Sequence, residues 1–298
     1  MSTADVVFVL PGASAADIEQ FRGLDVDRNW QCFVDGVSAW IVQTYLLLRD
    51  AGYPVSLVSD FSREALKVAH VVSLSRRSRP RGCFVVGVRA DYPSNPWCAA
   101  HVVQNKTQAG KSAIWIPHWP QPGMIPRDPS RGSRVETIGY FGRDINHYTR
   151  LFHRPSGWFK VRHTLERICD NLGLRLVTRG PDCWNDYHDV DIVVGLRDLG
   201  SATYDTKPPT KLINAWLADA VFIGGNDSAY RQIGQGDLNY LVASTPCEVR
   251  SRLEWLCNNS DDYSRMILDG AESVTAYQRS SVQQAWIAAL NTLRGIGS

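Results

Sequence analysis

Short runs of β-branched and apolar residues recur along the first part of the chain, each bounded by Gly, Pro, Asp or Ser. Such runs predict strands, here at residues 6–10, 54–59, 68–74, 83–88 and 112–117. Between the first two, apolar residues follow a helical spacing and predict a helix over residues 36–52; these are Val37, Trp40, Ile41, Tyr45 and Leu48. Gly52 is typical of a helix C-terminus. Strand, helix and strand in succession indicate an open, parallel α/β sheet.

A proline-rich stretch, residues 117–134, interrupts this rhythm and is interpreted as an interdomain linker. After it the α/β alternation restarts. We expect strands at 135–142, 174–180, 189–198 and 220–225, and helices at 159–173, 209–218, 244–259, 261–277 and 281–295. Within the helix at 244–259, Thr245 and Glu248 match a capping box.

The pattern therefore predicts two tandem α/β domains. We assign residues 1–125 to an N-terminal, acceptor-side domain and residues 133–280 to a C-terminal, donor-side domain. The closing helix, residues 281–298, is expected to pack back on the N-terminal domain. Parallel α/β sheets bind ligands at the carboxyl ends of their strands, so the cleft between two such domains is the expected site.

Composition narrows the class of protein. The net charge of +2 over 298 residues gives no reason to expect a nucleic acid partner. Seven scattered cysteines without a CxxC pair indicate reduced thiols, with neither a disulfide framework nor a zinc site. The apolar run near the start is too short for a signal peptide, and no run is long enough to span a membrane. We expect a cytoplasmic protein with at most peripheral contact with the inner face of the membrane.

The stretch "KPPTKLINAWLADAVFIGG", residues 207–225, places Lys207 and Lys211 around two prolines at the start of a helix. A helix N-terminus offers free N–H groups and a partial positive charge, and the lysines add full charges. This combination is suited to an anion such as a diphosphate. The alternative is an exposed loop that happens to carry two surface lysines.

Two strand ends add candidate ligands. In "IGYFGRD", residues 138–144, Gly142 allows close backbone approach and Arg143 can fork onto a phosphate. In "IGGNDSAYRQIG", residues 223–234, a Gly-Gly strand end is followed by three residues typical of helix N-caps. Their backbone amides could bind phosphate or sugar hydroxyls. The alternatives are an ordinary βα turn and a simply capped helix.

Taken together, these stretches resemble the GT-B glycosyltransferases with a family 1-like C-terminal domain. "GVSAWIVQTYLLLRDAGYPVSLVSD" is similar to the first glycine loop, helix and strand of that fold, and "GYFGR" to the first turn of its C-terminal domain. "DIVVGLRD" followed by "KPPTKLINAWLADAVFIGG" resembles its donor loop and the following helix and strand. The resemblance covers most of the chain and is strongest over residues 136–256. It implies an α/β fold of two Rossmann-like domains facing across a cleft.

The resemblance also implies an activity: transfer of a hexosyl or deoxyhexosyl group from a nucleotide-sugar to a glycan or lipid-linked acceptor, as in polysaccharide biosynthesis. Arg143 and Lys211 take the place of the diphosphate pair. Asn214 stands where family members commonly carry a Glu that holds the ribose, and "LGSATYDTKPP" replaces their acidic-Gly-Phe-Gly loop. The expected donor-binding residues are Gly142, Arg143, Lys207, Lys211, Asn214, Gly225, Asn226, Asp227 and Ser228.

The expected mechanism uses no metal and no cofactor. Neither "DVD" at 189–191 nor "SDD" at 260–262 ends a strand, so neither looks like a metal-binding DxD motif. Protein cations would then stabilise the leaving diphosphate. An inverting enzyme also needs a general base, for which Asp91, after the strand at 83–88, is the first candidate; a turn residue is the alternative. Asp35, His101 and His118 are reserves.

Two other functions fit the same outline: a non-catalytic binding protein for sugars or nucleotides, and a sugar-nucleotide epimerase. Strand-end His and paired carboxylates would favour the epimerase, and this set is not evident in the sequence. The basic stretch 73–82, with four arginines, could meet an anionic membrane or a lipid-linked acceptor. The alternative is a solvated loop between two strands.

Overall fold

The computed structural model describes residues 6–61, 65–75, 83–142 and 157–297, with the backbone alone at 157–160 and 296–297. The chain divides into two compact units. The first comprises Met1–Gly123, Thr206–Pro208 and Arg279–Ser298, and the second comprises Met124–Asp205 and Pro209–Gln278. The division thus falls inside the proline-rich stretch.

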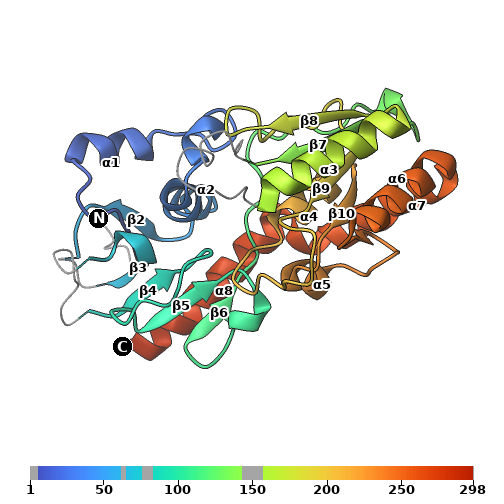
Figure 1. Cartoon of the computed structure of the whole chain (residues 1–298). Coiled ribbons are helices and arrows are strands. Elements are labelled where there is room, and N and C mark those ends of the chain that lie inside the picture. Colours follow the sequence, from blue (N-terminus) through green and yellow to red (C-terminus); the bar gives the residue numbers. More distant parts are fainter. Residues whose placement is uncertain (1–5, 62–64, 76–82, 143–156, 298) are drawn as a thin grey trace. The chain divides into compact units, whose positions relative to one another are not determined.

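The first unit is built on a six-stranded parallel sheet in the order β2-β1-β3-β4-β5-β6 (Figure 1). The strands are β1 (Val6–Val9), β2 (Val55–Val58), β3 (Leu66–His70), β4 (Val85–Val88), β5 (Ala100–Val103) and β6 (Ala113–Trp115). The central strands are buried along their whole length, as the continuous apolar runs predict for a sheet covered on both faces. The prediction of a parallel α/β sheet is confirmed.

Helices cover this sheet. They are α1 (Ala15–Arg22), a π-helical turn (Ser38–Val42) that continues into α2 (Gln43–Asp50), and α8 (Arg279–Gly297). Trp40, Ile41 and Leu48, whose spacing predicted the helix at 36–52, are buried in the core. Helix α8 contributes Trp286, wholly buried with its ring 6.4 Å from that of Phe8, so the first core contains residues from both ends of the chain.

The second unit has a five-stranded parallel sheet in the order β11-β10-β9-β7-β8. Its strands are β7 (Thr137–Phe141), β8 (Arg175–Arg179), β9 (Ile192–Gly195), β10 (Val221–Gly224) and β11 (Leu241–Val242). Its helices are α3 (Gly157–Leu172), α4 (Thr210–Leu217), α5 (Ser228–Ile233), α6 (Pro246–Asn258) and α7 (Ser260–Ser273). The capping box of Thr245 and Glu248 forms as predicted and begins α6.

Asp191 anchors the start of the second unit. Its wholly buried carboxylate pairs with Arg127 (2.8 Å) and Arg131 (2.7 Å). It also accepts hydrogen bonds from the backbone N–H groups of Glu136 and Thr137. Burial alone would raise the Asp191 pKa, but these hydrogen bonds hold it below its usual value. The later part of the proline-rich stretch is therefore fastened to the second sheet.

Both sheets have a point where the strand order reverses. In the first sheet β1 lies between β2 and β3, and in the second β7 lies between β8 and β9. Beyond the carboxyl ends of such strands the loops diverge in opposite directions and leave a crevice where ligands bind. The candidate sites of each unit are therefore expected beyond β1 and β3, and beyond β7 and β9.

Candidate functional site

Lys211 lies in the first turn of α4, the helix that follows β9. Its Nζ is 3.9 Å from the ring centroid of Tyr140, near the end of β7. Within the part of the chain that the structure describes, this ammonium has neither a hydrogen bond nor an ion pair. Burial and the neighbouring charge of Arg197 lower the Lys211 pKa to about 7, and Asp227 offsets part of this shift. The group is thus a poorly compensated cation at the reversal point of the second sheet.

Arg197 supplies a second cation, two residues beyond β9. Its Nε lies 2.6 Å from Oδ1 of Asp227, the residue before α5. Its guanidinium carbon is 5.8 Å from the ring centroid of Tyr204. Asp227 thus pairs with Arg197 and acts on Lys211 only through its charge, so among these three described side chains positive charge is in excess.

Asp227 is almost wholly buried, with 1% of its surface exposed. Burial raises its pKa, and Arg197 and Lys211 act in the opposite direction. Oδ1 pairs with Arg197, whereas Oδ2 has no hydrogen-bond partner in the described part of the protein. A buried carboxylate oxygen without a donor is costly unless a ligand or a water supplies one.

The turn after β10 is fastened to the loop that follows β9. The Asn226 amide donates to the carbonyl of Ser201 (2.7 Å) and accepts from Arg231 (2.7 Å). The backbone N–H of Ser228 donates to the carbonyl of Thr203 (2.7 Å). These contacts hold the predicted donor loop in one position against Gly225–Ser228.

Glycine is required at Gly142 by close packing. A Cβ there would lie 2.5 Å from a ring carbon of Tyr140, so a larger residue would displace the ring below Lys211. Asn214 is buried on α4 and forms a hydrogen bond with Tyr187. Arg143, the other predicted diphosphate ligand, lies outside the described residues. So do the four arginines of the basic stretch, at residues 76–82.

The remaining predicted residues belong to the first unit. Asp91 forms an ion pair with Lys207, whose carbonyl accepts a hydrogen bond from Asn105. Both side chains of the ion pair are about one third exposed. Lys207 and Lys211 thus belong to different units, and Lys207 already has an anionic partner.

The reserve candidates for a base also have partners in the first unit. Asp35 accepts hydrogen bonds from the backbone N–H groups of Val37 and Ser38, at the start of the helix. His101 accepts from the backbone N–H of Asn95, and burial lowers its pKa. Burial lowers the pKa of His118 to about 4, and its ring packs edge-on against that of Trp40.

No protein-family model matches the chain, and no curated protein matches it. Solved structures do. HepE from Anabaena, in complex with UDP-glucose, is 11% identical over 96% of this chain and 99% of its own, with a TM-score of 0.56. AviGT4, a glycosyltransferase involved in avilamycin A biosynthesis, is 12% identical over 97% and 98%, with a TM-score of 0.56. A glycosyltransferase from Rickettsia africae is 8% identical over 98% and 99%, with a TM-score of 0.53.

The chain has the GT-B glycosyltransferase fold. The expectation drawn from the sequence resemblance is confirmed at this level. Within this GT-B chain, the structure brings Lys211, Gly225 and Asp227 together in the second unit and adds Tyr140 to them.

Sequence reasoning missed Arg197 at this candidate site. The signal was present, because "DIVVGLRD" places an arginine just beyond a buried strand, as "GYFGR" does for Arg143. What the sequence could not show is that β9 lies next to β7, which brings Arg197 to the reversal point of the sheet.

Among the described residues, no three His, Cys, Asp or Glu side chains are grouped so as to hold a metal ion. No described helix meets the length and hydropathy needed to cross a bilayer.

Proposed function

We propose that the protein is a glycosyltransferase that moves a sugar from a nucleotide-sugar to a hydroxyl of a glycan or cell-surface precursor. In this reaction the bond from the anomeric carbon to the diphosphate breaks, and a bond from that carbon to the acceptor oxygen forms. The acceptor hydroxyl loses its proton, and a nucleoside diphosphate leaves with the bonding electrons. The observation that carries the proposal is the buried ammonium of Lys211 beside Arg197, which Asp227 compensates only in part and which no described residue pairs, in a chain with the GT-B fold.

The two cations would act on the leaving group. Negative charge grows on the diphosphate as the glycosidic bond breaks, and fixed cations stabilise it most in a site of low dielectric. Lys211 is already desolvated, and among the described residues it has no hydrogen bond or ion pair, so a diphosphate would supply its counter-charge. Arg197 is held in place by Asp227 and would need little reorganisation. Arg143 is proposed as a third cation of this site, and no metal or cofactor is required.

Asp227 would orient the sugar or ribose. Oδ2, which has no hydrogen-bond partner among the described residues, can accept a hydrogen bond from a hydroxyl, and the ion pair with Arg197 offsets the repulsion between the carboxylate and the diphosphate. Oδ2 is buried, so a hydroxyl would reach it only after a local rearrangement, and glycine at position 225, where a Cβ would lie 3.4 Å from Oδ2, keeps that approach free of a side chain. Asn226 and Ser228 would support the site by holding the loop that covers it.

If the reaction inverts configuration, Asp91 is the proposed base. It stands beyond β4, and its ion pair with Lys207 would have to open for the carboxylate to reach an acceptor hydroxyl. If the reaction retains configuration, no such base is required, and the ion pair of Asp91 and Lys207 then has only a structural role in the first unit.

The first experiment measures thermal stabilisation by nucleoside diphosphates and nucleotide-sugars. HepE has been solved with UDP and with UDP-glucose, and TarM from S. aureus with UDP, so uridine nucleotides come first. A ligand at 100 times its Kd should stabilise the fold by about 2.7 kcal/mol. We expect the shift to vanish in Lys211→Ala, to survive in Lys106→Ala, which removes an exposed lysine of the first unit, and to be unchanged by EDTA.

Each result has a distinct meaning. No shift with any nucleotide would remove the proposed function, and loss of the shift in EDTA would remove metal independence. Binding without transfer to any acceptor would favour the alternative of a non-catalytic nucleotide-sugar binding protein. Interconversion of the bound sugar without an acceptor would favour an epimerase.

A further inference from the structure

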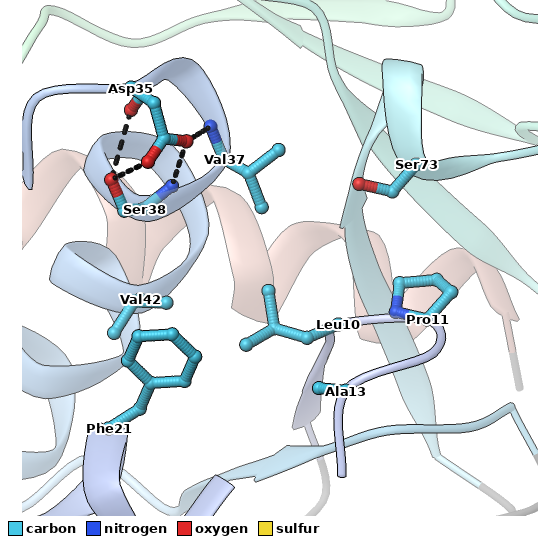
Figure 2. A pocket seen from close by; sticks show the side chains of 9 residues that line it. All are labelled: Leu10, Pro11, Ala13, Phe21, Asp35, Val37, Ser38, Val42 and Ser73. Atoms are coloured by element: carbon cyan, nitrogen blue, oxygen red, sulfur yellow. Dashed lines mark hydrogen bonds between the residues drawn. The ribbon is translucent and has the colours of Figure 1, made fainter. Parts of the chain in front are cut away.

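A pocket of about 200 Å³ lies at the reversal point of the first sheet. Leu10 and Pro11, just beyond β1, form one wall, and Ser73, three residues beyond β3, faces them (Figure 2). Phe21 from α1 and Val42 from the π-helical turn close the apolar side. The pocket therefore occupies the place where a parallel α/β sheet binds its ligand, and its lining is mostly apolar.

The polar side of the pocket is formed by Asp35 and Ser38, whose side chains are hydrogen-bonded to each other (Figure 2). The Ser38 hydroxyl donates to Oδ2 of Asp35 at 2.7 Å, while Oδ1 accepts from two backbone N–H groups. The Ser38 oxygen keeps its lone pairs as acceptors, and Oδ2 has room for one more donor. The pair can therefore accept hydrogen bonds from a ligand hydroxyl.

Charge decides which ligands fit. A helix N-terminus ordinarily favours an anion, but here the Asp35 carboxylate already occupies that position. Asp35 has no ion pair with any described residue. A phosphate placed in this pocket would meet a carboxylate that no described residue pairs, and like charges repel. The pocket is thus suited to a neutral group.

We propose that this pocket binds a neutral, partly apolar group of the acceptor, such as an aglycone ring or a deoxy-sugar, through a hydroxyl on Asp35 and Ser38. Cavities of about 150 Å³ already accommodate a benzene ring, so the pocket has room for one substituted ring. The proposal rests on the proposed function and narrows it. It disfavours an acceptor that is bound through its own phosphate.

The test compares two probes with the same ring, phenyl β-D-glucopyranoside and phenyl phosphate, by ligand-observed NMR on the full chain. We expect the neutral glycoside to bind at least about tenfold more tightly than the phosphate. Ala13→Trp fills the pocket and should abolish glycoside binding. Val72→Trp, at an exposed residue nearby that does not line the pocket, should leave it unchanged.

A second variant, Asp35→Asn, guards against the case in which Ala13→Trp loses glycoside binding only because it fails to fold. It keeps the size of the side chain and an oxygen for the backbone N–H groups but removes the charge, so it should strengthen phenyl phosphate binding. The proposal is overturned if the glycoside fails to bind the wild type, if Ala13→Trp still binds it, or if Asp35→Asn gains nothing for the phosphate. Stabilisation by UDP, measured on each variant, reports on the second unit. Glycoside binding without any nucleotide binding would therefore retain the pocket and remove the transferase.

Discussion

The affinity for a nucleoside diphosphate should fall as pH rises above neutrality, because Lys211 must be charged to hold the diphosphate. In the unliganded protein, burial and the charge of Arg197 lower the Lys211 pKa to about 7. A bound diphosphate would raise it by supplying the missing counter-charge. Binding therefore takes up a proton whenever the free lysine is neutral.

The size of the effect follows from proton linkage. A group whose pKa rises on binding contributes fully below its free-state pKa, and the contribution is lost as pH rises through and above that value. With a free-state pKa of about 7, affinity should be nearly level below that pH and should fall by about tenfold per pH unit above it. Over two pH units the loss approaches about 100-fold.

Isothermal titration calorimetry with UDP between pH 7 and 9 measures this slope. The range lies above the pH of about 6 at which a terminal phosphate loses its second proton. Buffers with different ionisation enthalpies count the proton taken up. The matched variant is Lys211→Arg, whose guanidinium stays charged over this range, so its profile should be flat. A flat profile in the wild type, or the same slope in Lys211→Arg, would refute the reasoning.

Three further predictions concern stability, each measured by urea denaturation. Asp191→Ala should lower the free energy of unfolding by about 3–5 kcal/mol, because it leaves Arg127 buried without its partner. In the wild type, the stability that ionised Asp191 contributes should begin to fall as pH drops below about 4, since its hydrogen bonds lower its pKa despite burial. Gly195→Ala should cost about 1–3 kcal/mol, because its Cβ would overlap a packed phenylalanine ring, whereas Gly200→Ala, with open space around it, should stay within about 0.5 kcal/mol. Trp286→Ala should cost about 3–5 kcal/mol through the cavity left in the first core, and a smaller loss would mean that α8 contributes little to that core.

The elements that the sequence predicted well are those with strong apolar patterns. The strands around β1, β9 and β10 are buried on both faces and read as uninterrupted apolar runs. Helix α1 was missed because it buries only Ile18, although Ser14 and Asp17 form a capping box that could have marked it. Its short apolar side leaves almost no periodicity to detect.

Prediction also failed where a local contact ends a strand early. The run at 68–74 predicts one strand, but β3 ends at His70, and a 3₁₀ turn, Val71–Ser73, follows. The imidazole Nδ1 of His70 accepts a hydrogen bond from the N–H of Val72, which turns the chain away from the sheet. The candidate site depends instead on long-range information, since only strand order brings Arg197 and Tyr140 close together.

Helix α8 has a consequence for how the chain is made. The core of the first unit includes Trp286 and Leu290, which are translated only after roughly 150 residues of the second unit. At about 5–20 residues per second, the ribosome needs about 8–30 s for that interval. At the end of this time every segment of the second unit has been translated, while β1 and α2 still lack the surface that α8 covers. We therefore expect the second unit to complete its core first, so that the order of folding runs against the order of synthesis.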